Sequence, residues 1–324
     1  MPSTPSDRSS FVPANANTVM PERFSLPEIP KIQGALELAW RTIEAAPRIH
    51  APGVHVFCVH QQTLIVRFLP ASEDECFVIG RHRECDVVLD ADPSVSLRHL
   101  LARAIRLDDG SVALRLLDLM TPLPLLLADG TMQRAVVATG PFAVGIGGYV
   151  IGGVPSDVER YETRGGPYRA PALVDRAERL PRAALDAPSG SRRSRITLMP
   201  GSRMVTEIPA WRGEGAARVT LSRAGRMVST PLDESTLENG ILIGRAGRCL
   251  DGGLRSVLST SVSRVHLMLL RDGAEDVAID LGSTQGTYAP HLGGRLRMMR
   301  LPPRALLRLG YVEPVDLVWD RPPR

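Results

Sequence analysis

Three stretches near the carboxyl terminus decide the fold: ILIGRAGRC (241–249), VLSTSVSRVHLMLL (257–270) and VAIDLGSTQGTY (277–288). Along VAIDL, Val277, Ile279 and Leu281 recur at every second position, which is typical of a strand with one face in a core. Other short apolar segments, including RVTLS, LRMMRL and VDLVW, continue the pattern to about residue 319. Residues 216–320 are therefore predicted to form a sandwich of short antiparallel strands.

The same order of residues occurs earlier in the chain. FVIGRHREC (77–85), DVVLDADPSVSLRHL (86–100) and LLDLMTPLPLLLADG (116–130) share with the later stretches an Ile-Gly-Arg, a Ser-x-x-His and an Asp-Leu. The step from arginine to serine is 15 residues in the first copy and 18 in the second, a difference the size of a loop. This internal repeat predicts a second, related β-sandwich over 52–154 and an all-β fold class.

The other segments differ in composition. Residues 1–30 are rich in Ser, Pro, Thr and Asn and are expected to be a disordered tail. In 31–47, Leu36, Ala39, Trp40 and Ile43 fall on one stripe, which predicts a short amphipathic helix that packs on a neighbouring domain. Residues 155–215 are rich in Arg and Pro and are expected to be a linker between the sandwiches.

Composition excludes several classes of protein. The 39 basic and 35 acidic residues are too evenly balanced to favour nucleic-acid binding. The chain contains no apolar run of the roughly 18 residues needed to span a bilayer and no recognisable export signal at its start, so we expect a cytoplasmic protein without membrane insertion. The four cysteines form no CxxC pair and are expected to be reduced thiols.

No catalytic or cofactor motif appears. The chain lacks GxSxG and GxxxxGK[ST], and GIGGYVIGG (145–153) is predicted to be a β-hairpin rather than a dinucleotide-binding turn. His55, Cys58 and His60 suggest a metal site, but His55 and Cys58 should point to opposite faces of one strand. We therefore expect no metal, no cofactor and no enzymatic activity.

The ordered set IGR, SxSRVH, DLGST and QGT lies within about 45 residues. This order resembles the forkhead-associated (FHA) domain, a two-sheet sandwich that binds phosphothreonine peptides with loops at one end. The resemblance covers about 100 residues twice. It implies that phosphate is bound by Arg245, Ser263, Thr284 and Arg264, that Gln285 stands where the family usually has an asparagine that holds the peptide backbone, and that Gly244, His266 and Gly286 support the loops.

Those residue types suit a phosphate ligand. A phosphothreonine carries about −1.5 to −2 charges and strong acceptor oxygens, so its reader needs a cation and several neutral donors. Arg245 would supply a fork-shaped charge, and the hydroxyl groups of Ser263 and Thr284 would supply further donors. We expect loss of Arg245 to weaken binding by at least about tenfold.

The first copy departs from the pattern. Arg81, Ser96 and His99 match, but the loop MTPLPLLL (120–127) places Pro122, Leu123 and Pro124 opposite Thr284, Gln285 and Gly286. By resemblance it is a degenerate FHA domain with a vestigial site. Two interpretations stand: the copy has lost phosphate binding, or it still binds phosphate through Arg81 and Ser96.

The resemblance implies a non-catalytic adaptor that docks a threonine-phosphorylated protein in a bacterial Ser/Thr kinase pathway or a kinase-regulated secretion apparatus. The partner would be such a kinase or its substrate. The alternative is a structural scaffold in which both sandwiches make contacts that do not depend on phosphate.

Overall fold

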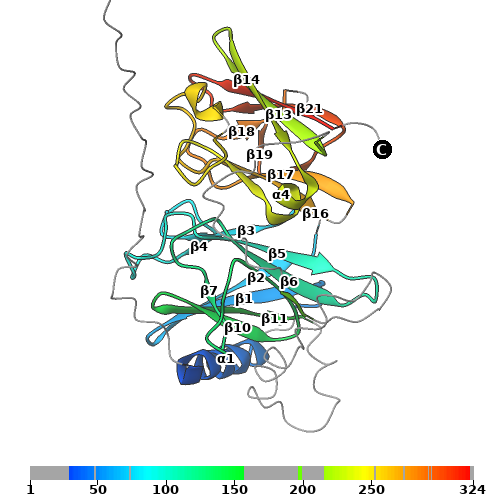
Figure 1. Cartoon of the computed structure of the whole chain (residues 1–324). Helices are drawn as coiled ribbons and strands as arrows, with labels where there is room; N and C mark the ends of the chain where they lie inside the picture. The colour runs from blue at the N-terminus through cyan, green and yellow to red at the C-terminus, as the bar shows by residue number, and fades with distance from the viewer. Residues whose placement is uncertain are drawn as a thin grey trace, which may run out of the picture.

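The computed structural model describes residues 29–46, 49–72, 74–156, 196–198, 215–251, 253–272, 274–290, 292 and 294–321. The predicted tail lies almost entirely outside the described residues, as does most of the predicted linker. Two β-sandwiches are stacked on each other, one formed by residues before 200 and one by residues after 214 (Figure 1). We call them the first half and the second half. The predicted all-β architecture is confirmed.

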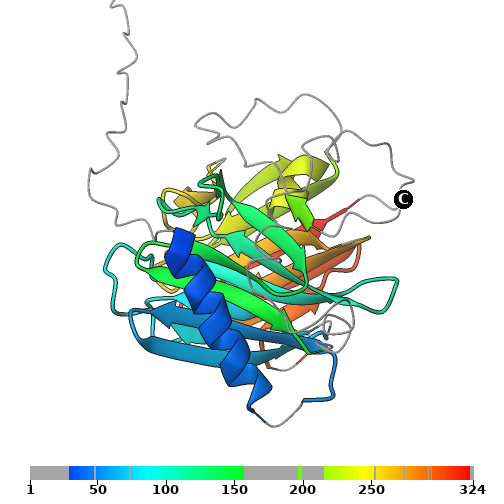
Figure 2. The same cartoon turned by 90° about the horizontal axis from the view of Figure 1, so that it is seen from below.

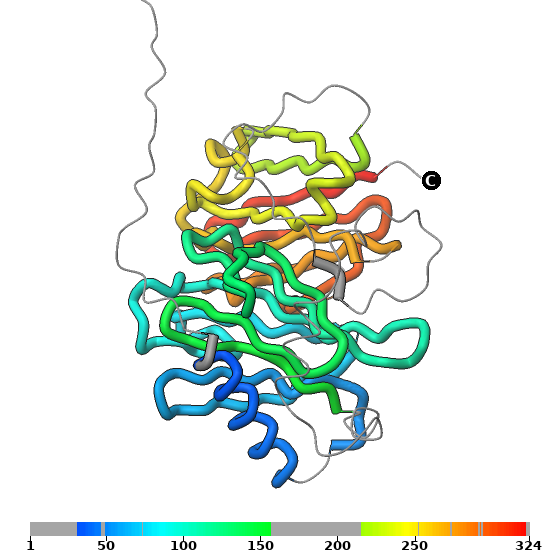
Figure 3. Tube along the Cα trace, turned by 60° about the horizontal axis from the view of Figure 1, so that its bottom comes forward, coloured from blue at the N-terminus to red at the C-terminus, as the bar shows by residue number. Residues whose placement is uncertain are grey.

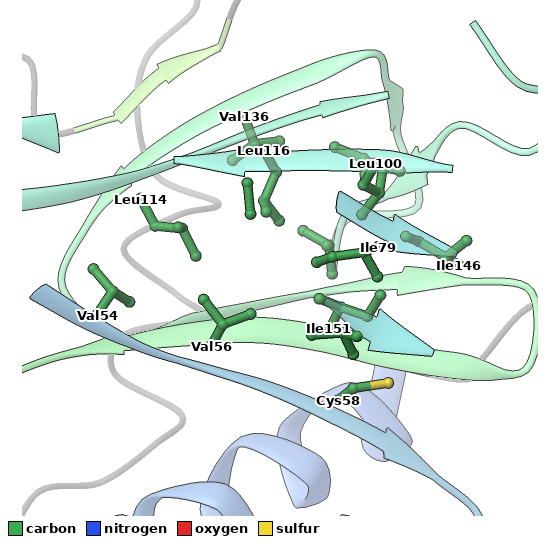
Figure 4. Packing of buried hydrophobic residues seen from close by; sticks show 14 of the residues in the cluster. Val54, Val56, Cys58, Ile79, Leu100, Leu114, Leu116, Val136, Ile146 and Ile151 are labelled. Atoms are coloured by element: carbon green, nitrogen blue, oxygen red, sulfur yellow. The ribbon is translucent and has the colours of Figure 1, made fainter. Parts of the chain in front are cut away.

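The first half has two six-stranded sheets, in the orders β2-β1-β11-β10-β7-β8 and β12-β9-β6-β5-β3-β4. Val54, Val56 and Ile151 from one sheet pack against Leu114 and residues of the other sheet (Figure 4). All strand pairs given for this half are antiparallel except β3 with β4. The strands are β1 (Gly53–His60), β2 (Thr63–Pro70), β3 (Phe77–Gly80), β4 (Val87–Val88), β5 (Leu100–Arg106), β6 (Val112–Asp118), β7 (Leu125–Leu126), β8 (Met132–Gln133), β9 (Ala135–Thr139), β10 (Phe142–Ile146), β11 (Tyr149–Pro155) and β12 (Ile196–Leu198).

Helix α1 (Ile29–Glu44) lies across the outer face of the first of these sheets (Figure 2). Leu36, Ala39 and Trp40 are buried there against Phe57 and Val150. The helix ends before residue 47, the end expected from the sequence, because Pro47 disfavours helical backbone at the residue before it. The sequence GIGGYVIGG forms the β10–β11 hairpin, as predicted.

The second half has sheets of six and four strands, in the orders β14-β13-β22-β21-β18-β19 and β15-β16-β17-β20. Trp319, Leu317 and Leu267 are fully buried in the core between them. The elements are β13 (Ala217–Arg223), β14 (Arg226–Leu232), α4 (Glu234–Asn239), β15 (Ile241–Ile243), the 3-10 turn η2 (Leu254–Ser256), β16 (Leu267–Asp272), β17 (Glu275–Asp280), β18 (Thr287–Tyr288), β19 (Arg295–Leu296), β20 (Met298–Arg300), β21 (Arg304–Leu309) and β22 (Val315–Asp320).

Two elements differ from the sequence prediction. Residues 196–198, inside the predicted linker, form β12 and pair with β9, so part of that linker belongs to the first half. The short helix α4 was not predicted. Its start is fixed by Asp233, whose carboxylate accepts a hydrogen bond from the amide of Thr236 at 2.6 Å.

The two halves share a third core. The sheet containing β5 and β6 packs its outer face against the sheet containing β16 and β17 (Figure 3). Residues at equivalent positions of the repeat meet there: Val78 and Leu242, Cys85 and Cys249, Leu101 and Met268, Leu117 and Ile279. This contact explains why β6 is buried along its whole length and β16 over five of its six residues.

Charged groups surround this shared core. Arg297 pairs with Asp86 at 2.7 Å, and Arg103 pairs with Asp272. Arg115 donates from Nη2 to the carbonyl oxygen of Glu238 at 3.0 Å. The halves are therefore joined by an apolar contact and by ion pairs and hydrogen bonds at its edges.

Candidate functional site

Loops at one end of the second half bring together residues that are far apart in the sequence. Arg245 follows β15, Ser263 precedes β16, and Thr284 lies between β17 and β18. We call Arg245, Ser263 and Thr284 the Ser263 rim. The backbone amide of Gly310 donates to the carbonyl oxygen of Gly286 at 2.9 Å, so the β21–β22 loop lies beside it.

Arg245 is held by the backbone of Val262 and Ser263. Its amide donates to the carbonyl oxygen of Ser263 at 3.3 Å, and its Nε donates to that of Val262 at 2.6 Å. The side chain is exposed, and its two Nη nitrogens have no hydrogen-bond or ion-pair partner among the described residues. The charged end of the guanidinium is therefore oriented and accessible.

Ser263 and Thr284 are in direct contact. The amide of Thr284 donates to the Ser263 hydroxyl oxygen at 3.1 Å, although 21 residues separate them. The Thr284 side chain is exposed and makes no hydrogen bond to a described residue. The structure thus places a guanidinium and two hydroxyl groups on one exposed rim.

His266 connects the loop that carries Ser263 to the loop that carries Gly286. It is fully buried, and its Nδ1 accepts a hydrogen bond from the amide of Ser263 at 2.9 Å. Its Nε2 lies 3.1 Å from the carbonyl oxygen of Gly286. Because Nδ1 accepts, Nε2 carries the hydrogen and donates, so the ring is neutral. Burial lowers the pKa of His266 to about 4, against the opposing effect of Asp280.

Asp280 organises the loop that carries Thr284. Its carboxylate accepts from the Ser283 amide at 2.7 Å, the Ser283 hydroxyl at 2.5 Å and the Thr287 hydroxyl at 2.7 Å. Sequence reasoning quoted these three residues within the DLGST and QGT motifs but assigned them no role. The signal was an Asp followed by Ser and Thr three and seven residues later, a spacing that allows side chains to bond the turn backbone.

Two predicted glycines occupy positions where a larger residue does not fit. A Cβ on Gly244 would lie 2.4 Å from the carbonyl oxygen of Arg264. Gly286 has φ +79°, and its Cβ would lie 3.0 Å from the Tyr288 hydroxyl. The first permits close approach of two loops, and the second a left-handed turn after Gln285.

Arg264 and Gln285 lie next to the rim but are not part of its hydrogen bonding. The Arg264 side chain is exposed and the Gln285 side chain is half-buried, and neither makes a side-chain hydrogen bond or ion pair with a described residue. Both groups are available to a ligand.

The first half repeats the local framework of the rim. Arg81 Nε donates to the carbonyl oxygen of Val95 at 2.6 Å, and the Ser96 amide donates to His99 Nδ1 at 3.1 Å. His99 is fully buried, and burial lowers its pKa to about 4. Its Nε2 lies 2.7 Å from the carbonyl oxygen of Leu123. The loop that follows β6 lacks the equivalent of the hydrogen bond from the Thr284 amide to the Ser263 hydroxyl, because Pro122 stands at that position and has no amide hydrogen.

The cysteine thiols are buried, which disfavours the reactive thiolate form. The four cysteines are buried and unpaired, and burial raises the pKa of Cys58 to about 12 and of Cys85 and Cys249 to about 11. In the part of the chain that the structure describes, no three His, Cys, Asp or Glu side chains gather to hold a metal ion. No helix in that part is long and apolar enough to cross a membrane.

Comparison with known proteins finds similarity only among solved structures. No protein family and no curated protein matches the chain. Mycobacterium tuberculosis Rv1747 FHA-1 is 23% identical, with TM-score 0.26, over 33% of this chain and 98% of its own. The FHA domain of FhaA, solved with the intracellular domain of Rv3910, is 26% identical, with TM-score 0.24, over 32% and 98%. The CT664 domain from Chlamydia trachomatis is 18% identical, with TM-score 0.25, over 32% and 95%.

All three are FHA domains. Each match leaves most of this chain uncovered, so none of the three describes the stacking of two halves.

Proposed function

We propose that the second half is an FHA domain that binds a phosphothreonine on a protein partner through the Ser263 rim. One observation carries this proposal: the Nη nitrogens of Arg245 are unpaired among the described residues, beside the Ser263 hydroxyl group, which accepts from the amide of Thr284 in the facing loop. A dianion with several acceptor oxygens matches that set of donors.

Each residue has a distinct role in this proposal. The guanidinium of Arg245 donates two hydrogen bonds to the phosphate, and the hydroxyl groups of Ser263 and Thr284 donate to the remaining oxygens. Arg264 adds a second, more exposed charge. Gln285 contacts the peptide backbone with its amide in the place where the FHA family usually has asparagine.

The framework beneath the rim supports preorganised binding. His266 connects the Ser263 loop to Gly286, and Asp280 fixes the Thr284 loop through Ser283 and Thr287. Donors that are already oriented lose less conformational freedom when a ligand binds. The buried, neutral state of His266 is suited to such a role in loop geometry, since a charged ring could not accept at Nδ1.

The protein then acts as a non-catalytic adaptor. Its partner is a threonine-phosphorylated protein, either a Ser/Thr kinase or a kinase substrate, in bacterial kinase signalling or a kinase-regulated secretion system in the cytoplasm. On this proposal the first half is a degenerate FHA domain in tandem with the second.

The proposal is tested by fluorescence polarisation with a phosphothreonine peptide library and the full-length chain. We expect Arg245→Ala to weaken binding by at least about tenfold, because one charge-assisted hydrogen bond contributes roughly 1.5 to 3 kcal/mol. Phosphoserine and unphosphorylated peptides of the same sequences should bind more weakly than the phosphothreonine peptides.

Arg304→Ala is the matched control. Arg304 has an 82% exposed side chain at the end of the second half away from the rim, where it lies 3.4 Å from Asp320. Its loss removes the same charge without touching the rim. Equal affinity of Arg245→Ala and Arg304→Ala, or equal binding of unphosphorylated peptide, would contradict the proposal and favour a phosphate-independent scaffold.

A further inference from the structure

The Ser96 loop of the first half lies directly beside the second half. Arg248, three residues after Arg245, donates from Nη1 to the Ser96 hydroxyl oxygen at 3.4 Å. Its Nη2 donates to the carbonyl oxygen of Arg98 at 2.9 Å. Both sets of loops lie on the same side of the molecule, left of the strands in Figure 1.

Arg248 stands where the first half lacks a donor. In the second half, the Ser263 hydroxyl oxygen accepts from the amide of Thr284. The equivalent residue in the first half is Pro122, which has no amide hydrogen to donate. The Ser96 hydroxyl receives its hydrogen bond from Arg248 instead, so a neutral donor of the same domain is replaced by a cation of the other domain.

This arginine is specific to the second copy of the repeat. The equivalent position in the first copy is Glu84, so the contact is not duplicated on the other side. Arg248 is half-buried, and its Nε is buried without a hydrogen-bond partner in the described part of the chain. Desolvation, and the nearby charges of Arg264 and Arg98, lower the pKa of Arg248. A buried cation of this kind is stabilised by an anion.

Arg81 faces the same loop. Its Nε bonds to the carbonyl oxygen of Val95, and its Nη nitrogens have no partner among the described residues. Asp118, an acid whose charge acts on Arg248, is already engaged by Arg134 and by the Thr121 hydroxyl. Two cations, Arg81 and Arg248, therefore lie against Ser96.

We infer that Arg81 and Ser96 of the first half, together with Arg248 of the second half, form a second anion site that binds a phosphate dianion. The site lies in the domain that the sequence marks as degenerate and is completed across the contact between the halves. It takes free phosphate or a phosphorylated side chain. It goes beyond the proposed function, since it uses none of the residues of the Ser263 rim.

The test uses the full-length chain carrying Arg245→Ala, so that the outcome does not depend on the Ser263 rim. Inorganic phosphate and a capped phosphothreonine amide are titrated separately while the arginine Nε–Hε signals of Arg81 and Arg248 are followed by NMR. We expect saturable shifts of both signals. Shifts with both probes identify phosphate itself as the ligand, and shifts with the amide alone identify a phosphorylated side chain.

Two variants and one control locate the site. Arg248→Gln and Ser96→Ala should each weaken phosphate binding, the first by at least about tenfold. If Arg248→Gln loosens the contact between the halves, Ser96→Ala still tests the site. It removes only the hydroxyl group and leaves the fold intact. Arg83→Gln is the control, because Arg83 is 89% exposed in the same loop and pairs with Glu84 at 3.5 Å.

Three results would overturn the inference. The first is an absence of shifts in the Arg245→Ala chain. The second is an equal loss of affinity in Arg83→Gln and Arg248→Gln, which would indicate diffuse attraction by positive charge. The third is unchanged phosphate affinity in Ser96→Ala.

Discussion

At the scale of single residues, two buried histidines hold the loops of the two halves. His99 and His266 each accept at Nδ1 from the amide of a serine, and each has a pKa of about 4. Protonation would remove the acceptor and place a charge in the interior. The acid sensitivity of the loops should therefore originate in these two rings.

We expect both rings to stay neutral, with hydrogen on Nε2, at pH 5.5 in the folded protein. An unfolded histidine binds a proton near pH 6.5, whereas these two bind one near pH 4. The contribution of each neutral ring to the free energy of unfolding is therefore fully present above about pH 6.5 and falls as the pH drops towards 4. The loss is about 3 kcal/mol for each ring at most. Ring-nitrogen NMR checks the tautomer, and urea unfolding at pH 7 and pH 5 checks the stability. A protonated His266 signal at pH 5.5 would refute the assignment.

Sequence reasoning named the residues of the Ser263 rim and, through the resemblance, the supporting Gly244, His266 and Gly286, but assigned no role to Asp280 or Arg248. Arg245 and Ser263 belong to the repeat and to the resemblance, and Thr284 belongs to the resemblance, so all three could be named beforehand. Arg248 could not, because its contact with Ser96 spans 152 residues and depends on how the halves pack. No periodicity within either half encodes that contact.

At the scale of elements, the turn at Gly286, next to the Ser263 rim, is constrained in two ways. It combines a positive φ with crowding, because a Cβ atom at this position would lie 3.0 Å from atoms of Arg295 and Tyr288. Gly225, in the β13–β14 hairpin, has nearly the same φ of +78°, but a Cβ atom there would meet nothing within 4 Å. Comparing the same substitution at Gly225 and Gly286 therefore separates the effect of backbone strain from the effect of crowding.

We expect Gly225→Ala to cost about 1 kcal/mol, from the positive φ alone, and Gly286→Ala to cost more, up to about 3 kcal/mol. Urea unfolding measures both. Gly286→Ala should also weaken peptide binding, since the carbonyl oxygen of residue 286 accepts from His266. Equal stability of the two variants would mean that the turn at residue 286 relaxes freely.

Strand prediction succeeded where alternation or an apolar run was clear, as along β6 and β17. It failed at β12 and α4 for different physical reasons. β12 has three residues and is added to a sheet edge by pairing with β9, a long-range contact that local sequence does not encode. α4 has six residues, too few for a periodic signal, and depends on the Asp233 cap.

At the scale of the whole molecule, the shared core makes the two halves depend on each other. Met268 is 2% exposed in that core, on the face of β16 that points away from the core of its own half. Met227, in β14, is 71% exposed. The same substitution at the two positions distinguishes the shared core from a general effect of added charge.

We expect the wild-type chain to unfold in one cooperative transition. Met268→Glu should lower the free energy of unfolding by about 3 kcal/mol or more, because it buries an unpaired charge, and should separate the transition into two. Met227→Glu should change it by less than about 0.5 kcal/mol. Calorimetry and urea unfolding provide the measurement. A single unchanged transition in Met268→Glu would show that the halves do not depend on this contact.

The contact between Arg248 and Ser96 also fixes the spacing of the two loop sets. Because the shared core holds the two proposed sites at a fixed distance, they select a partner that bears two phosphates with the matching number of residues between the phosphorylated positions. Once the first phosphate is bound, the second meets its site at a high effective concentration, so avidity rises steeply for partners with the matching span.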